Sequence, residues 1–102
     1  MEAMELYQRA VSTREATNRE DLALVSPLEQ LGKIYQTMGR NEEAERSFLR
    51  ALRLMEGHLG LSSPALIDPL SKLASLYHIM GKTASEEHMQ ERLQAIQSKP
   101  PQ

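Results

Sequence analysis

The 102-residue sequence repeats itself with a period of 42 residues. Several residues recur unchanged at this distance, among them Leu24, Pro27, Leu28, Leu31, Tyr35, Met38, Gly39 and Glu45, which correspond to Leu66, Pro69, Leu70, Leu73, Tyr77, Met80, Gly81 and Glu87. A shorter match, at a shift of 41, pairs residues 2–15 with residues 43–56. Periods of this length are typical of proteins built from stacked helical units. The chain therefore holds two full repeats preceded by half of another.

Apolar residues within each repeat have the spacing of α-helices. One series is Leu24, Leu28, Leu31 and Tyr35, and a second is Ala44, Phe48, Ala51, Leu52 and Met55. Steps of three and four residues predict two helices in each repeat, called here the A-type and B-type helices in chain order. The composition, with no tryptophan or cysteine and one phenylalanine, also favours helix over strand. We expect an all-α fold of five helices, arranged as antiparallel helix-turn-helix repeats.

A glycine stands between the two helices of each repeat. The connecting segments are Gly39-Arg40-Asn41 and Gly81-Lys82-Thr83. Glycine adopts the left-handed conformation that ends a helix without steric cost. Asn41 and Thr83 are expected to cap the helices that follow. Because these turns are short, the paired helices should run antiparallel.

The A-type helices are expected to begin at polar caps. Ser63 precedes Pro64, and proline suits the first helical position because its missing N–H would have no partner there. Asp21 is the equivalent cap in the preceding repeat.

Pro27 and Pro69 lie about five positions into these helices, where an interior proline costs about 3 kcal/mol. The sequence therefore predicts either a bend at each proline or a later helix start. With a later start, Ser26 and Asp68 would be the caps.

The helix pair resembles a tetratricopeptide repeat (TPR) in its small and aromatic positions, which are Leu31-Gly32, Tyr35, Gly39, Ala44, Phe48 and Ala51. The 42-residue period and the segments 39–45 and 59–64 resemble the longer kinesin-light-chain type of repeat. The resemblance implies a short right-handed superhelix of about two and a half repeats. It also implies a protein-protein interaction scaffold that binds a peptide or protein segment in a concave groove lined by the A-type helices.

The repeats divide the chain into a domain over residues 1–97 and a short tail. Within the domain we expect a lone B-type helix over about residues 2–16 and repeats over about residues 21–57 and 63–97. The tail, residues 98–102, is expected to be disordered because its two prolines cannot continue a helix.

Once the core positions of the A-type helices are set aside, their remaining residues should face the groove. These candidates for peptide contact are Ser26, Glu29, Lys33, Gln36 and Thr37 in the first repeat and Asp68, Ser71, Ser75, His78 and Ile79 in the second. Purely structural roles remain open for several of them. Glu29 and Lys33 would also form an ordinary exposed pair, worth about 0.2–0.5 kcal/mol. The serines would let helices approach, and His78 would be solvated.

The last B-type helix carries polar residues where a repeat usually packs against the next one. Glu86, Gln90 and Leu93 stand at the positions of Ala44, Phe48 and Ala51. This substitution pattern predicts a polar end cap for the stack.

The first B-type helix has no A-type partner in the sequence. Its apolar residues form a possible self-association face, Ala3, Tyr7, Ala10 and Val11. A homo-oligomer or additional upstream repeats would cover this face. The alternative function is therefore a structural or self-associating segment of a longer TPR solenoid, with no ligand groove of its own.

Catalytic or metal-binding chemistry is not expected from this sequence. His58, His78 and His88 have no spacing of four residues that would place two of them on one helical face. There is no cysteine, and no glycine-rich loop followed by lysine that would hold a phosphate. We expect no enzyme activity, no metal and no cofactor.

The charge pattern and the apolar runs indicate the class of partner. The formal charge of −2 comes from interleaved acids and bases, so the one-sided basic surface that nucleic acids require is missing. No apolar run approaches the roughly 20 residues that span a bilayer, and the acidic amino terminus is unlike a secretory signal. We expect a protein or peptide partner, no nucleic acid, no membrane insertion and a cytoplasmic location.

Overall fold

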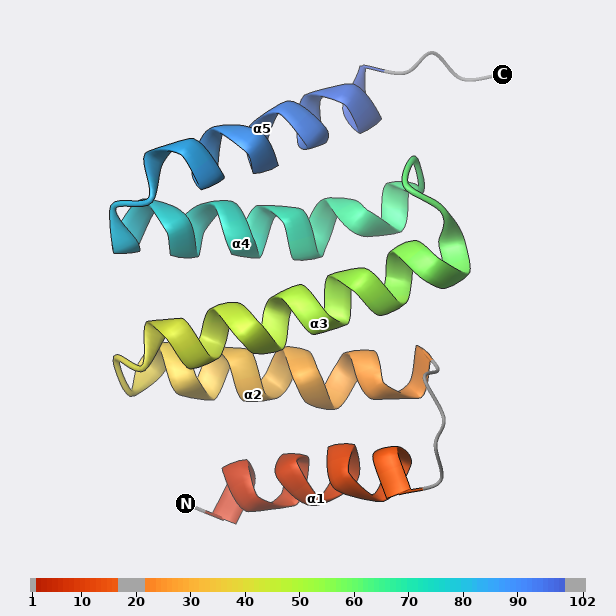
Figure 1. Cartoon of the computed structure of the whole chain (residues 1–102), viewed down its shortest axis with the longest axis vertical. Coiled ribbons are helices and arrows are strands. Elements are labelled where there is room, and N and C mark those ends of the chain that lie inside the picture. Colours follow the sequence, from red (N-terminus) through yellow and green to blue (C-terminus); the bar gives the residue numbers. More distant parts are fainter. Residues whose placement is uncertain (1, 17–21, 99–102) are drawn as a thin grey trace.

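The computed structural model describes residues 2–16 and 22–98, which form five α-helices side by side in chain order (Figure 1). The helices are α1 (Glu2–Ala16), α2 (Val25–Thr37), α3 (Asn41–Leu59), α4 (Ile67–Met80) and α5 (Thr83–Gln97), with short 3₁₀ turns η1 (Leu22–Leu24) and η2 (Pro64–Leu66). None of the described residues is in a strand, which confirms the all-α prediction. Helices α2 and α4 are the A-type helices, and α1, α3 and α5 are the B-type helices.

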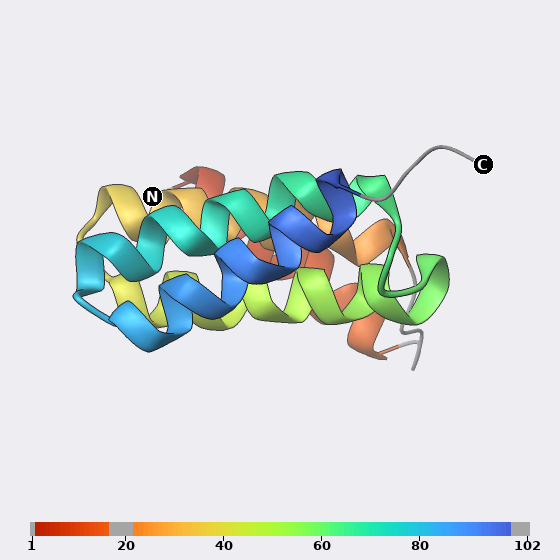
Figure 2. The same cartoon turned by 90° about the horizontal axis from the view of Figure 1, so that it is seen from above.

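Each helix packs against its neighbour in the chain, so the helices form one continuous stack. Seen along the stack (Figure 2), α2 and α4 lie toward one side and α3 lies toward the other. This arrangement brings the two A-type helices to a common face of the molecule.

The glycine turns end the A-type helices as predicted. Gly39 and Gly81 have φ angles of 78° and 73°. At the first turn, the N–H of Arg40 donates to the carbonyl of Tyr35 at 2.8 Å, and this pattern recurs one repeat later. The prediction that Asn41 caps α3 was wrong, as was the matching prediction for Thr83 in α5. The preceding residue already accepts the first helical hydrogen bond, so Asn41 and Thr83 lie inside the first turn.

The A-type helices begin in two stages. Ser63 is the predicted cap of η2, where its hydroxyl accepts a hydrogen bond from the N–H of Ala65 at 3.2 Å, and Pro64 follows directly. Asp21 lies outside the described residues. The α-helical part then starts at Val25 or Ile67.

This later start explains how the prolines are accommodated. Pro27 and Pro69 are the third residues of α2 and α4, where a backbone N–H has no intrahelical acceptor to lose. The caps predicted for a later start, Ser26 and Asp68, were wrong. The residue before each α-helix is a leucine with helical backbone angles at the end of a 3₁₀ turn, and it makes no side-chain cap bond.

Two apolar clusters fill the stack. The N-terminal cluster contains Val11, Leu24, Leu28, Leu31, Ala51 and Leu54. The C-terminal cluster contains Ala44, Phe48, Leu52, Leu66, Leu70, Leu73, Ala74, Leu76, Tyr77, Met89 and Leu93. Helix α3 contributes to both, so it joins the two repeats into one core. Of the predicted tail, Ser98 is described, and its hydroxyl donates to the carbonyl of Gln94 at 2.6 Å, while residues 99–102 lie outside the described part.

A glycine in α2 leaves room for an aromatic ring of α3. A Cβ atom at Gly32 would lie 2.6 Å from Cε1 of Phe48, whose side chain is almost fully buried. The ring therefore occupies the space that any larger residue at position 32 would need.

Replacing Gly32 by alanine should destabilise the protein. The added methyl group must displace a packed aromatic ring, and overpacking of this kind typically costs about 1–3 kcal/mol. Gly57→Ala is the matched control, because Gly57 lies in α3 and a Cβ there would meet no atom within 4 Å. Gly57→Ala should be neutral or stabilise by up to about 1 kcal/mol. Urea unfolding of both variants measures the difference, and equal effects would contradict the packing assigned to Phe48.

A polar contact also joins the two repeats. The Tyr77 hydroxyl donates to Oε2 of Glu45 at 2.9 Å, and Nζ of Lys82 donates to Oε1 at 2.9 Å. Burial alone would raise the pKa of Glu45, but the hydrogen bonds from Lys82 and Tyr77 lower it below the ordinary value of 4.5. Burial, together with the hydrogen bond to the Glu45 carboxylate, raises the pKa of Tyr77 to about 12.

The Glu45 contact predicts a stability that depends on pH. Glu45→Gln should lower the free energy of unfolding at pH 7 by about 1 kcal/mol, since the donors lose a charged acceptor. A folded-state pKa below 4.5 means that the wild-type contribution is present above pH 4.5 and is lost as the pH falls through that lower pKa. In urea unfolding between pH 7 and pH 3, the free energies of unfolding of the wild type and of Glu45→Gln should become equal at the acidic end.

Alkaline pH supplies the control for the same contact. Because the folded-state pKa of Tyr77 is above the ordinary value of 10.0, its contribution is present below pH 10 and is lost as the pH rises toward 12. Tyr77→Phe should remove this alkaline loss. A Glu45→Gln effect that stays constant from pH 7 to pH 3 would show that the carboxylate charge has no part in joining the repeats.

Candidate functional site

A hollow lies between the two A-type helices on their common face. This central hollow has a volume of about 320 Å³ and is lined by Lys33, Gln36, Phe48, Ser71, Lys72 and Ser75. Four of the predicted groove residues line it, two from α2 and two from α4, and Phe48 comes from α3 between them. The structure therefore brings together groove candidates that lie about 40 residues apart in the sequence.

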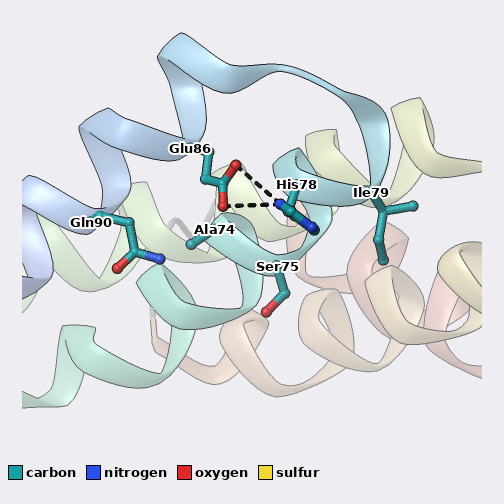
Figure 3. A pocket seen from close by; sticks show the side chains of 6 residues that line it. All are labelled: Ala74, Ser75, His78, Ile79, Glu86 and Gln90. Atoms are coloured by element: carbon teal, nitrogen blue, oxygen red, sulfur yellow. Dashed lines mark hydrogen bonds and ion pairs between the residues drawn. The ribbon is translucent and has the colours of Figure 1, made fainter.

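A second hollow continues along α4 toward α5. This end hollow has a volume of about 480 Å³ and is lined by Ala74, Ser75, His78, Ile79, Glu86 and Gln90 (Figure 3). The Glu86 carboxylate points from α5 toward the His78 ring, and its Oε2 lies 3.3 Å from Nδ1. Ser75 lines both hollows, so they lie next to each other along α4.

The two hollows are equivalent positions in successive repeats. Lys33, Gln36 and Phe48 in the central hollow correspond, 42 residues later, to Ser75, His78 and Gln90 in the end hollow. In the central hollow the following A-type helix supplies the opposite wall, whereas no described helix follows α5. An apolar ring in one repeat is thus replaced by an exposed amide in the next.

Some predicted groove residues serve the structure instead. Glu29 on α2 lies 3.4 Å from Nζ of Lys72 on α4, and Asp68 lies 2.9 Å from the same atom. Burial alone would lower the pKa of Lys72, but the two carboxylates raise it above its ordinary value. The ordinary pair expected between Glu29 and Lys33 was therefore wrong, because Glu29 reaches across to the neighbouring repeat.

Lys72 is a lining residue that the sequence reasoning missed. Its position four residues after Asp68 was a usable signal for that ion pair, but the partner on α2 lies 43 residues away in the chain. The remaining candidates line neither hollow. Ser26 is exposed, and the Thr37 hydroxyl donates to the backbone carbonyl of Lys33 at 2.9 Å.

The predicted self-association face of α1 is divided between two sides of the helix. Val11 is 7% exposed and Tyr7 is half-buried, and both pack into the N-terminal cluster. Val11 is therefore not available to a second molecule, since α2 already covers it. Ala3 and Ala10 are exposed, and Leu6 beside them is 64% exposed.

The described residues contain no group of three or more histidine, aspartate or glutamate side chains placed to hold a metal ion. None of the helices in the described part of the chain is long and apolar enough to cross a membrane. The polar side chains that line the two hollows include Lys33, Gln36, Ser71 and Ser75, whose groups can form hydrogen bonds.

Comparisons with known proteins agree with this architecture. The sequence model of the tetratricopeptide repeat family matches residues 24–99. A crystal structure of the nearly identical TPR-like repeats of a putative kinesin light chain from Podosopora anserina superimposes with a TM-score of 0.80 at 24% sequence identity. The match covers 99% of this chain and 48% of that one, so this chain spans about half its length. No curated protein matches the sequence. With its repeat, its helix pairs and this family match in agreement, the chain belongs to the tetratricopeptide repeat family.

Proposed function

We propose that this protein is an interaction scaffold that binds a segment of another protein along its A-type face. Tetratricopeptide repeats generally serve as protein-interaction scaffolds, and the family is not a catalytic one. The observation that carries the proposal is the pair of hollows that share Ser75 and run from α2 across α4 to α5.

The lining residues offer the groups that a polypeptide needs. The Gln36 amide both donates and accepts hydrogen bonds, as do the hydroxyls of Ser71 and Ser75. Lys33 is exposed and adds a positive charge, while Ile79, 61% exposed, offers apolar surface at the far end. Such a mixture suits a segment with exposed backbone groups and at least one apolar side chain.

The helices hold these groups in place before a ligand arrives. Glu29 and Lys72 link α2 to α4, and Glu45, Tyr77 and Lys82 link α3 to α4 and the turn after it. A fixed surface loses little conformational entropy on binding, which favours affinity for a given area of contact.

The second candidate function is a structural segment of a longer stack. Two observations favour it: the exposed Leu6 on α1, and the match to about half of a longer TPR-like chain. Light scattering tests the self-associating form of this candidate, because a monomer at all concentrations would exclude self-association.

Groove substitutions should reduce binding without changing the fold. The groove variant combines Lys33→Ala, Gln36→Ala, Ser75→Ala and His78→Ala, and the control variant combines Glu42→Ala, Arg53→Ala, Glu87→Ala and Glu91→Ala, four exposed residues of the B-type helices. The probes are peptides selected from a random display library against the wild-type domain, measured by fluorescence anisotropy. We expect at least a tenfold loss of affinity for the groove variant only, because several hydrogen bonds and one charge are removed together.

Circular dichroism checks that both variants keep the wild-type helicity. Peptides that bind the groove variant and the wild-type protein equally well would show that the A-type face is not the binding surface. A selection that enriches no peptide would also count against the proposal.

A further inference from the structure

The end hollow contains a carboxylate whose partner is a histidine. Glu86 on α5 points toward the ring of His78 on α4, and its Oε2 lies 3.3 Å from Nδ1 (Figure 3). The histidine is charged only when it is protonated. None of the described residues that line this hollow is a lysine or an arginine. The end hollow therefore carries a negative charge whenever His78 is neutral.

The cations of the same part of the chain bind carboxylates of α3. Helix α5 and the turn before it contain one lysine and one arginine, Lys82 and Arg92. Nζ of Lys82 donates to Oε1 of Glu45 at 2.9 Å, and Nη2 of Arg92 forms an ion pair with Glu56. Because both side chains are held by α3, they leave the Glu86 carboxylate available to a positive charge from a bound segment.

The two hollows differ in charge at equivalent positions of the repeat. Lys33 in the central hollow corresponds, 42 residues later, to Ser75. Ala44, which is fully buried, corresponds to Glu86 in the end hollow. The step from one repeat to the next thus removes a positive charge and adds a negative one.

The other lining residues suit a long basic side chain. Ala74 and Ile79 offer apolar surface on α4, and Ile79 is 61% exposed. The amide oxygen of Gln90 and the hydroxyl of Ser75 can accept hydrogen bonds from an ammonium or guanidinium group. Lysine and arginine lay their aliphatic stems on apolar surface while their charged ends meet polar groups. The end hollow, with a volume of about 480 Å³, offers both kinds of surface.

We propose that the end hollow is the subsite for a lysine or arginine side chain of the bound segment, with Glu86 as its counter-ion. This inference rests on the proposed function of the A-type face. The cation pairs with the Glu86 carboxylate, and its stem lies on Ala74 and Ile79. Hydrogen bonds between ionised groups are about twice as strong as those between neutral groups. The end hollow thus selects a basic residue in the bound segment.

Peptide selection tests this preference for positive charge. The same random display library is selected against the wild type, Glu86→Lys and Glu91→Lys. Glu91 is exposed on α5 and does not line the hollow, so its substitution is a control with the same change of net charge. We expect lysine and arginine to be enriched about threefold at one peptide position with the wild type and the control, and not with Glu86→Lys. Equal frequencies in the three pools would overturn the proposal.

A charge swap tests the contact with Glu86 itself. A fluorescent peptide from the wild-type pool is compared, by fluorescence anisotropy, with a version in which glutamate replaces the enriched basic residue. The replacement should weaken binding to the wild type about tenfold, because two carboxylates would meet in the hollow. Glu86→Lys should restore most of that affinity, and Glu91→Lys should not. A loss of equal size with all three proteins would exclude Glu86 as the counter-ion.

A second variant covers the case in which Glu86→Lys changes the fold. Glu86→Gln keeps the shape of the side chain and removes its charge, and it should also abolish the enrichment of basic residues. Circular dichroism compares the helicity of each variant with that of the wild type. Basic residues that stay enriched with a normally helical Glu86→Gln would contradict the proposal.

These outcomes separate the cation subsite from the proposed function. Peptides that lose affinity for the groove variant but show no preference for basic residues would leave the A-type face as the binding surface and overturn the subsite alone. A selection that enriches no peptide, or peptides that bind the groove variant as well as the wild type, would overturn both.

Discussion

The packing of the Phe48 ring against Gly32 sets the distance between the helices of the first pair, and the other features of the stack depend on it. The ring fills the space where a Cβ would stand, so α2 and α3 approach closely and the aromatic side chain is 1% exposed. From this position Phe48 also reaches α4 and forms part of the central hollow. One contact thus fixes a helix pair, joins it to the next pair and shapes the candidate site.

Polar contacts help to fix the position of the two repeats relative to each other. Apolar packing is not directional, so by itself it leaves some freedom for one helix to slide along another. The Glu45 carboxylate, held by Tyr77 and Lys82, and the ion pair of Glu29 with Lys72 restrict that freedom at two separate places. Because Lys72 also lines the central hollow, the same contacts that order the stack keep the proposed binding face in one shape.

Much of the fold could be predicted because it is repeated in the sequence. The leucine spacing and the two glycine turns specify helix pairs, and the small residues between the helices are the features that resemble the family. The predictions of side-chain helix caps were wrong where backbone groups already make the first hydrogen bonds of the helix. Asn41 and Thr83 were expected to cap helices, but the residue before each had already begun the helix. In the same way, the 3₁₀ turns made caps at Ser26 and Asp68 unnecessary.

The candidate site was predictable only in part because its residues come from different repeats. Residues that face the common side of α2 and α4 follow from helical periodicity, so Lys33, Gln36, Ser71 and Ser75 could be proposed in advance. The spacing of residues within one helix does not predict which residues of another repeat they contact. Glu29 was therefore assigned to Lys33, four residues away, when its structural partner is Lys72. The division of the α1 residues between a covered and an open side likewise depends on which neighbour is present.

The most direct test of this account is the proton NMR signal of Gly32. Phe48 is the only phenylalanine in the chain, so contacts between its ring protons and the α-protons of Gly32 can be assigned without ambiguity. The account predicts strong nuclear Overhauser effects between these protons and a clear ring-current shift of the Gly32 α-protons. Gly32 α-protons at random-coil positions, with no contact to the Phe48 ring, would contradict the helix packing on which the stack and its binding face both depend.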